Sequence, residues 1–548
     1  MPRTKISLIM TGAVSLGSFE AGVLTELLYA LDYHSRHGKE YELDVITGAS
    51  AGAMTAGLVA HIVMNDIGRR ANLYRAWVEL VTIDNLLNDP PPNALLSQAP
   101  IRQIANQCIT GPYTTENRAP FAPQVLRVAL TLSNLNGIDR RLKPAVGPPF
   151  VSTFFDDRKI FRLADDPASL ESVRREQTWE QVRRFAIASG AFPIAFPPSP
   201  LERTLAEYND PQLITTFSSK ATYVDGGTFN NQPIGEAVKL SREADADFFG
   251  QQRKFIFVNA SVNNSMFLGD EEISKTIDMP PAVLKRVADV IFNESRTSDW
   301  IRALLINDQI VWRDQFIDTL IKIVKDTTIE NTPEFIQNLR DLAAQIIAGS
   351  RMEPGERVDS LGIDELLAKT KSRYKTKLDG QGVEGRAREV LELIFFALDN
   401  ISDLDERKRI DIFSIGPETK LAGEQLQAFG GFFKKEYRQY NFRSGRKLAY
   451  AQLSRDEVLG NYPKESGDEE YQQCDSPPGW ANFPDEDLDQ TPRPPREKLR
   501  DALVERAKSL IDNVTFTGWR LPDAAIREGV REAIGNLAYY RLNSLFKL

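Results

Sequence analysis

The chain has 548 residues, of which 42% are apolar, and its 67 Lys and Arg against 76 Asp and Glu give a net charge of −9. This composition suits a protein with a large folded core, and the acidic balance argues against general binding to nucleic acid. The two cysteines, Cys108 and Cys474, are too few for a disulfide scaffold or a structural zinc site, and we expect neither a metal nor a cofactor. No apolar run approaches the roughly 20 residues of a membrane-spanning helix. We therefore expect a soluble cytoplasmic protein that at most touches a membrane surface, of unknown oligomeric state.

The N-terminal stretch combines a buried strand with a loop of small residues. Ile6–Met10 is apolar except for Ser7, and Gly12–Gly17, with the sequence GAVSLG, opens a helical pattern over Phe19–Leu31. The start superficially resembles a signal peptide, but its apolar run is short and already contains this loop, so we interpret it as part of the fold. Such a loop presents consecutive backbone N–H groups to an anion, as an oxyanion hole requires.

A second predicted strand turns into a helix around a serine. Val45-Ile46 enters the segment Gly48-Ala49-Ser50-Ala51-Gly52, and a helical pattern follows. In a nucleophile elbow, small residues such as Gly48 and Gly52 allow the backbone segments to approach closely, and one hydroxyl remains at the apex. Ser50 is that hydroxyl, and the N-terminus of the following helix would stabilise negative charge beside it. The same pattern also arises by chance in turns rich in glycine and alanine.

Beyond the elbow, helical and strand patterns alternate. We predict, in chain order, mixed helix and loop over 67–120, broken at Pro90–Pro92 and forming a cap over the site; a buried strand over Val125–Leu132; a hairpin over Phe150–Leu163 with its turn at Asp156-Asp157; and a helix over Glu180–Ala188.

A carboxylate follows the next predicted strand. Ala221–Val224 leads into Asp225-Gly226-Gly227, in which the glycines allow a tight turn. A triad hydrolase would need an imidazole base, but the chain has no histidine after His61. Neither His61 nor the earlier His34 and His37 is well placed for Ser50. If Ser50 is a nucleophile, Asp225 is therefore the simplest choice of base. Otherwise this segment is only a turn.

Strands that alternate with helices indicate an α/β fold, here a three-layer α/β/α sandwich with a mostly parallel central sheet. Helical periodicity replaces the strand pattern after Lys254–Ala260 and persists until a strand at Ile410–Ile415. We expect five segments: an α/β catalytic core over 1–265, a helical insertion or cap over 266–409, a return to the core as strand and helix over 410–465, an acidic, proline-containing linker over 466–500, and a C-terminal helical extension over 501–548. The extension either packs on the protein or docks at a lipid interface.

These motifs together resemble the patatin-like phospholipases over residues 1–235. The segments Ala188–Pro193 and Asn230–Pro233 resemble those that the family carries before and after its Asp-Gly-Gly motif. The resemblance implies a lipid acyl hydrolase that cleaves lipid esters through an acyl-serine intermediate, in transient contact with a membrane surface. It further implies that Ser50 is the nucleophile, that Asp225 is the base, and that Gly12, Ala13 and Val14 supply oxyanion N–H groups.

One position departs from the family pattern. The family loop commonly reads G-G-G-x-R/K-G, whereas Leu16 stands here at the basic position. Backbone donors survive this change but the cation does not, which implies low activity or a different substrate, and an arginine at position 16 is expected to raise or preserve activity. Leu16 also keeps an alternative open, namely a weakly active or inactive patatin-fold scaffold that is regulated by an effector and acts through its helical insertion.

Overall fold

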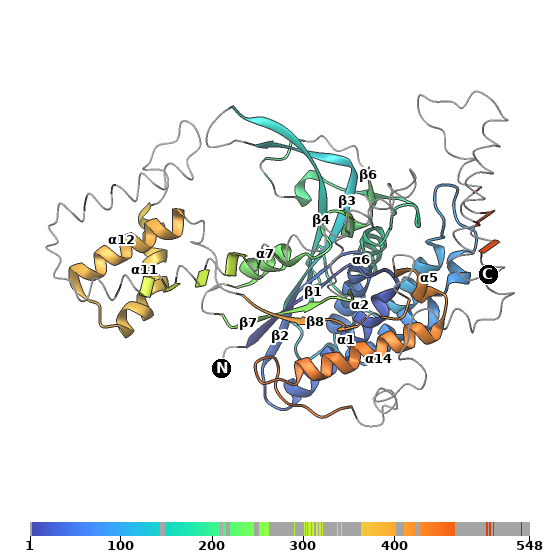
Figure 1. The fold of residues 1–548 in the computed structure, drawn as a ribbon, viewed down its shortest axis with the longest axis horizontal. Coiled ribbons are helices and arrows are strands. Elements are labelled where there is room, and N and C mark those ends of the chain that lie inside the picture. The colour runs from blue at the N-terminus through green and yellow to red at the C-terminus, as the bar shows by residue number, and fades with distance from the viewer. Residues whose placement is uncertain are drawn as a thin grey trace, which may run out of the picture.

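Within the part of the chain that the computed structural model describes, eight strands form one sheet in the order β5-β6-β3-β2-β1-β7-β8, with β4 paired to β3 (Figure 1). The described residues are 3–142, 148–208, 210, 212–214, 220–245, 251–261, 363–401, 410–419, 421–423 and 428–465, with scattered helical positions at 290–341 and 500–539. The strands are β1 (Thr4–Met10), β2 (Tyr41–Gly48), β3 (Val125–Leu142), β4 (Phe150–Ala164), β5 (Ser199–Glu202), β6 (Lys220–Val224), β7 (Arg253–Val258) and β8 (Asp411–Ile415).

Helices connect these strands. The longer helices are α1 (Gly17–Arg36), α2 (Ala51–Asn65), α5 (Ala99–Cys108), α6 (Glu176–Ser189), α7 (Ile234–Ala244), α11 (Ile363–Gly380), α12 (Gly385–Ile401) and α14 (Lys435–Leu453). The short ones are η1 (Val14–Leu16), η2 (Ile67–Ala71), α3 (Asn72–Tyr74), η3 (Arg75–Leu80), α4 (Ile83–Leu86), η4 (Leu205–Glu207), η5 (Gly226–Thr228) and η7 (Gly430–Phe432).

The centre of the sheet is parallel and one flank is antiparallel. β3, β2, β1, β7 and β8 pair in parallel, whereas β4 and β6 run antiparallel to β3, and β5 runs antiparallel to β6. Parallel neighbours end at the same edge, so the loops after β1 and β2 lie side by side there. The expected mostly parallel α/β sheet is confirmed.

The alternation of side chains along β1 divides the core between two faces of the sheet. Ile6 and Leu8 pack in the larger cluster, with residues of α1, α2, α6 and α14. Ile9 packs in a second cluster with Ile234 and Leu240 of α7. The sheet therefore lies between two helical layers, which is the sandwich that the sequence predicts.

The C-terminal part of the core packs against its N-terminal part. α14 lies along α1 (Figure 1), and the buried Arg446 of α14 donates a hydrogen bond of 3.4 Å to the buried Glu26 of α1. β8 pairs in parallel with β7 at the edge of the sheet. Residues 410–465 thus contribute both a strand and a helix to the core.

The hairpin predicted within Phe150–Leu163 is wrong. β4 is one continuous strand, and it pairs antiparallel with β3, which extends well beyond the predicted end at Leu132. Asp156 and Asp157 lie inside this strand, opposite Ser133 and Leu132.

A tertiary cluster explains why Asp157 is not in a turn. Its side chain is buried, and its Oδ2 accepts hydrogen bonds from Arg203 at 3.3 Å, Tyr208 at 2.8 Å and Tyr223 at 3.0 Å. These partners follow 46 or more residues later in the chain. A carboxylate that is fully hydrogen-bonded in the interior no longer favours a solvent-exposed turn.

α11 and α12 have a small apolar core of their own and are set apart from the sheet in Figure 1. This core contains Ile317, Ile321, Tyr374, Leu378, Val383, Leu391 and Phe395. The remainder of the predicted insertion, and nearly all of the predicted linker and C-terminal extension, lie outside the described residues. The proposed segment boundaries therefore stay predictions.

One helix in the described part of the chain, Val14–Arg36, is long and apolar enough to cross a membrane, which differs from the expectation of no such segment. Its most apolar stretch is 89% buried inside the fold. This burial is what the central helix of a folded core requires.

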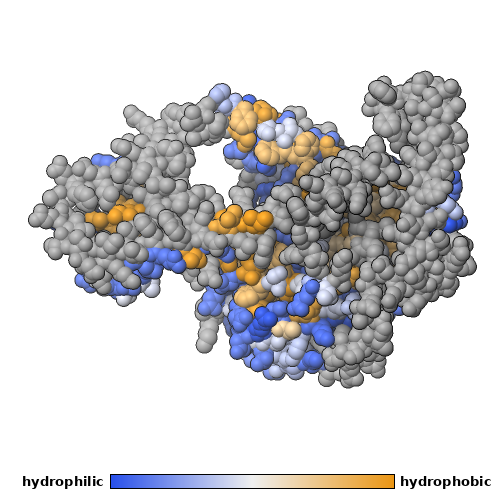
Figure 2. Space-filling model, viewed as in Figure 1, coloured by the Kyte–Doolittle hydropathy of each residue, from blue (hydrophilic) through white to orange (hydrophobic). Residues whose placement is uncertain are grey.

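Apolar side chains are also exposed on the β3–β4 pair. Leu135, Phe150, Val151 and Phe155 are each 43–53% exposed, and Figure 2 shows apolar surface gathered at the projecting end of these strands. Phe155 stacks on Phe229 with ring centroids 6.4 Å apart. The exposed surface therefore reaches the segment that follows Asp225.

Candidate active site

Ser50 occupies the turn between β2 and α2 in a strained backbone conformation. β2 ends at Gly48, α2 begins at Ala51, and Ser50 has φ 52° and ψ −120°. A Cβ at Gly52 would lie 2.5 Å from the carbonyl oxygen of Thr11, so only glycine fits where this turn approaches the loop after β1. The local sequence thus places the Ser50 hydroxyl at the carboxyl edge of the sheet.

Asp225 follows β6 and contacts Ser50 directly. The Ser50 Oγ donates a hydrogen bond of 2.5 Å to Asp225 Oδ2, and both side chains are at most 5% exposed. The Gly227 N–H donates to the other carboxylate oxygen at 2.7 Å. A Cβ at Gly226 would lie 2.2 Å from the carbonyl oxygen of Thr131 on β3, so this turn also requires glycine. Two segments far apart in the sequence therefore meet as a hydroxyl and a fixed carboxylate.

Two polar side chains that the sequence reasoning missed hold the backbone around this pair. Ser189 Oγ accepts a hydrogen bond of 2.9 Å from the Ser50 N–H, and Asn231 Oδ1 accepts one of 3.0 Å from the Gly12 N–H. Ser189 lies in the segment 188–193 and Asn231 in the segment 230–233. The resemblance of these segments to those that flank the family's Asp-Gly-Gly motif was the one sequence signal that pointed to them. Residue type alone did not reveal their roles, because each depends on a distant backbone partner.

The loop after β1 lies beside Ser50, but its three backbone N–H groups, those of Gly12, Ala13 and Val14, differ in whether they already have a hydrogen-bond partner. A Cβ at Gly12 would lie 3.0 Å from the Ser50 Cβ, which places this loop next to the hydroxyl. The Gly12 N–H is already bonded to Asn231, which differs from its expected role as an oxyanion donor. Among the described residues, no hydrogen bond engages the N–H of Ala13 or Val14. The N–H groups of Ala13 and Val14 therefore stay candidates for the expected oxyanion site.

Leu16 is not at the surface of the site. Its side chain is 2% exposed and belongs to the larger apolar cluster of the core. An arginine here would have to bury its charge, so the expectation that Leu16→Arg preserves or raises activity does not agree with this environment.

The three histidines lie in other surroundings. His34 contacts the carbonyl oxygen of Gly460 at 3.2 Å, and His37 contacts that of Tyr33 at 2.7 Å. His61 is fully buried with its ring 4.8 Å from that of Trp179, and burial lowers its pKa to about 3. A histidine that stays neutral at ordinary pH in an aromatic pocket has a packing role.

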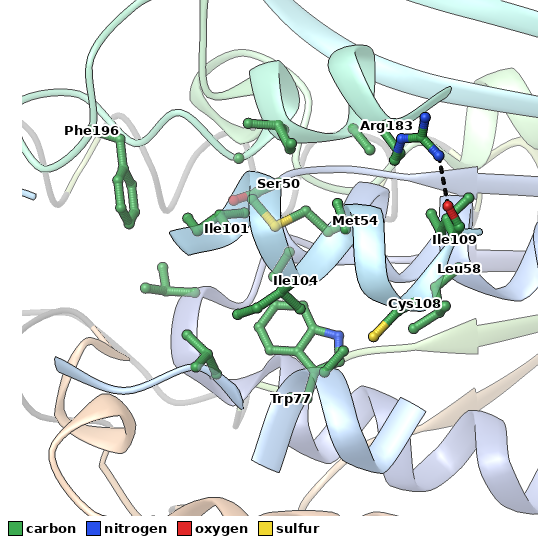
Figure 3. A pocket seen from close by; sticks show the side chains of 18 of the residues that line it. Ser50, Met54, Leu58, Trp77, Ile101, Ile104, Cys108, Ile109, Arg183 and Phe196 are labelled. Carbon is green, nitrogen blue, oxygen red and sulfur yellow. Dashed lines mark hydrogen bonds between the residues drawn. The ribbon is translucent and has the colours of Figure 1, made fainter. Parts of the chain in front are cut away.

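An apolar pocket adjoins Ser50 (Figure 3). α2, α5 and α6 contribute side chains such as Met54, Ile104 and Ala186, and Trp77 of η3 closes another side. Residues of the stretch 67–120 therefore cover the pocket, as the predicted cap requires. Arg183 is the one charged side chain among the described lining residues. Such a cavity suits a hydrocarbon chain.

Parts of this chain are similar to known proteins. An uncharacterized protein of Sinorhizobium fredii is 24% identical over 363 residues, which cover 50% of this chain and 51% of that protein. An uncharacterized membrane protein of Mycobacterium tuberculosis is 26% identical over 218 residues, which cover 36% of this chain and 19% of that protein. The chain thus spans about half and about a fifth of the lengths of these relatives.

The crystal structure of VipD from Legionella pneumophila aligns with 100% of this chain and 85% of its own chain at 10% identity, with a TM-score of 0.21 that is too low to support an inference. The family model of patatin-like phospholipase matches residues 8–238, the span that holds Ser50, Asp225 and the loop after β1. Residues 8–238 are therefore a patatin-like phospholipase domain, and hydrolysis of lipids is the activity that this family indicates.

Proposed function

We propose that the chain is a serine-dependent lipid acyl hydrolase that cleaves carboxylic esters through Ser50 and Asp225. The observation that carries the proposal is the 2.5 Å hydrogen bond from Ser50 Oγ to Asp225 Oδ2 beside an apolar pocket. A positioned carboxylate can activate a hydroxyl nucleophile, and the pocket can hold the acyl chain of the ester. The family match supports lipids as the substrate class.

The proposed reaction has two halves. In the first, Asp225 accepts the Ser50 proton as Oγ attacks the ester carbonyl, and the N–H groups of Ala13 and Val14 bind the oxyanion. The intermediate collapses, the alcohol leaves with the proton from Asp225, and an acyl-serine remains. In the second half, Asp225 accepts a proton from water, and the hydroxide attacks the acyl-serine. Collapse of that intermediate releases the fatty acid and returns the proton to Ser50.

The dyad is tested by hydrolysis of a short p-nitrophenyl ester. Ser50→Ala and Asp225→Asn should each lower kcat on the order of 10⁴-fold, and the double variant should be little worse, because the two residues act as a unit. Ser241→Ala, which removes a buried hydroxyl on the α7 face, is the matched control and should keep full activity. Wild-type turnover in either dyad variant would exclude this mechanism.

Two observations favour the alternative of a weakly active or inactive scaffold. The Gly12 N–H is bonded to Asn231, and Leu16 supplies no cation. A fluorophosphonate probe separates the two functions, because an activated Ser50 is labelled covalently whereas a serine without an effective base is not. Labelling that disappears in Ser50→Ala supports the hydrolase, and absence of labelling in the wild type supports the scaffold.

A hydrolase acting on bilayer lipids also needs an apolar surface that meets the membrane, and we propose a cytoplasmic protein with such a peripheral contact. The exposed Phe150 and Val151 at the end of β4 are one candidate surface. The C-terminal extension is the other, and nearly all of it lies outside the described residues. Deletion of 529–548 or the pair Phe150→Ser and Val151→Ser should reduce binding to phosphatidylglycerol-containing vesicles, while a soluble ester is still cleaved. Unchanged vesicle binding in both variants would contradict this contact.

A further inference from the structure

The apolar pocket beside Ser50 has a closed far end. Figure 3 shows Ser50 and Ile101 at one end, with Leu58, Cys108 and Arg183 at the other. The three side chains of the far end are at most 5% exposed, whereas Ile101 at the Ser50 end is only partly buried. A chain attached to Ser50 would therefore enter from the partly open end and point toward a wall.

Three helices give similar lengths for this channel. The lining residues run from Ser50 to Leu58 along α2, from Ile101 to Cys108 along α5, and from Gly190 back to Arg183 along α6. At about 1.5 Å per residue, these stretches span about 12 Å on α2 and about 10 Å on each of the other two. Gly190 marks the near end on α6, because a Cβ there would lie 2.0 Å from Met54 Cε, one turn beyond Ser50.

The far wall is polar behind its apolar lining. Arg183 donates hydrogen bonds of 2.6 Å to the carbonyl oxygen of Ile109 and 2.8 Å to Glu180, and it also pairs with Glu176. Burial alone would lower the pKa of Arg183, but the two carboxylates outweigh it and the pKa is raised, so the side chain stays charged. A hydrocarbon that passed Leu58 would have to break the hydrogen bonds and ion pairs of Arg183, which is costly in a buried site.

Cys108 completes the wall as an apolar group. Burial raises the pKa of its thiol to about 11, so it is neutral at ordinary pH and is not a nucleophile. Its side chain is 1% exposed and faces the channel beside Leu58 (Figure 3).

We propose that Leu58, Cys108 and Arg183 form a stop that limits the acyl chain of the ester substrate to about ten carbons. An extended hydrocarbon advances about 1.25 Å per carbon, because bonds of about 1.5 Å meet at tetrahedral angles. A channel of about 10 to 12 Å therefore holds eight to ten carbons beyond the carbonyl. This inference rests on the proposed function, since it assigns the acyl specificity of the same site.

The wild-type enzyme tests the stop with p-nitrophenyl esters of 4 to 16 carbons, each kept below its aggregation concentration. The value of kcat/KM should rise by up to about fourfold per added methylene, as expected from its burial, and stop rising near ten carbons. We call the chain length at which the rise stops the break. Fluorophosphonates with alkyl chains of the same lengths provide a second readout, because their rate of reaction with Ser50 should show the same break without requiring turnover.

Variants at the far end should move the break in opposite directions. Leu58→Ala lengthens the channel and should shift the break by two to three carbons toward longer chains. Cys108→Met fills the end and should shift it toward shorter chains. Val59→Ala is the matched control, because Val59 is a fully buried neighbour on α2 that does not line the pocket. It should leave the break in place.

The outcomes separate this inference from the proposed function. If the wild type hydrolyses esters through Ser50 but kcat/KM rises evenly to 16 carbons, or if Leu58→Ala leaves the break where it was, the stop is wrong and the hydrolase stands. If hydrolysis and labelling do not depend on Ser50, both are wrong. A break near ten carbons that moves only in the Leu58 and Cys108 variants supports the proposal.

Discussion

Ser50 and Val14, which both line the apolar pocket, have positive φ angles of 52° and 51°. Such conformations cost about 1–3 kcal/mol each for residues with a side chain, and a β-branched residue such as Val14 tolerates them poorly. They persist because their surroundings hold them. The Ser50 N–H is bonded to Ser189, and Ser15, next to Val14, contacts the carbonyl oxygen of Ala428 and accepts from the Gly431 N–H at 3.0 Å. Strain at both residues is consistent with a preorganised reaction site.

The buried environment of Leu16 leads to a prediction about stability. Leu16→Arg should lower the free energy of unfolding by about 3 kcal/mol or more, because it places an unpaired charge in the core. Activity should fall with the folded fraction and not rise. Leu16→Met, which keeps an apolar side chain of similar size, should cost about 1 kcal/mol or less. Urea unfolding followed by circular dichroism measures both. An active, equally stable Leu16→Arg protein would show that the guanidinium reaches solvent or the oxyanion.

Sequence motifs could predict Ser50 and Asp225 as candidates because the local backbone demands glycines around them, and those glycines are visible in the sequence. The bond from Gly12 to Asn231 could not be predicted, since it joins residues 219 positions apart and depends on the final packing. The positive φ of Val14 could not be predicted either, because nothing in the sequence indicates that a valine takes this backbone conformation at a position where the family pattern has glycine. The roles of these residues in catalysis stay predictions.

At the level of elements, β4 depends on a buried ion pair. Arg203 and Asp157 are 3.3 Å apart with 2% of each side chain exposed, and Arg203 also contacts Glu207 at 3.0 Å. Arg203→Leu should lower the free energy of unfolding by about 3–5 kcal/mol, because Asp157 then remains buried without its cation. Arg174→Leu is the control, since the side chains of Arg174 and Asp165 are 47% and 29% exposed and solvent screens their pair, so its loss should change stability little. Equal losses in a denaturant titration would contradict a special role for the buried pair.

The same cluster shows why local patterns identified some elements and not others. β1, β2 and α2 follow from apolar runs and glycine placement within a few residues. The sequence of β4 is interrupted by two aspartates, and only the later Arg203, Tyr208 and Tyr223 make Asp157 compatible with a strand. The local sequence therefore favours a turn, whereas the tertiary contacts of Asp157 stabilise a strand.

On the scale of the whole molecule, the family-matched span 8–238 does not contain everything that shapes the site. Phe432 lines the apolar pocket, and Gly431 is bonded to Ser15 of the loop after β1. Both belong to η7, which precedes α14 in the part of the chain that returns to the core. The stretch from η7 to α14 therefore connects the pocket, the loop after β1 and the helical layer around α1.

Arg438 of α14 holds this connection together. It is 1% exposed and donates hydrogen bonds of 3.0–3.2 Å to the carbonyl oxygens of Gly431, Phe432, Lys434 and Val78. Burial lowers its pKa to about 10, so it remains charged at neutral pH. Val78 lies in η3, next to Trp77 of the pocket wall. The Arg438 side chain thus joins the cap and η7 through hydrogen bonds to backbone carbonyl oxygens. When this side chain is removed, no other donor replaces it at those oxygens.

We therefore expect Arg438→Leu to reduce kcat/KM for a short ester by about 10- to 100-fold even where the protein is folded, because small displacements of the loop after β1 and of Phe432 misplace the reacting groups. Arg438→Lys should recover part of this loss, since an ammonium retains the charge but cannot reach all four carbonyls. Lys435→Ala, at an exposed position on the same helix, should change neither activity nor stability. Steady-state kinetics well below the midpoint of thermal unfolding separate misplacement from unfolding. Full activity of folded Arg438→Leu would show that the family-matched span shapes the site without α14.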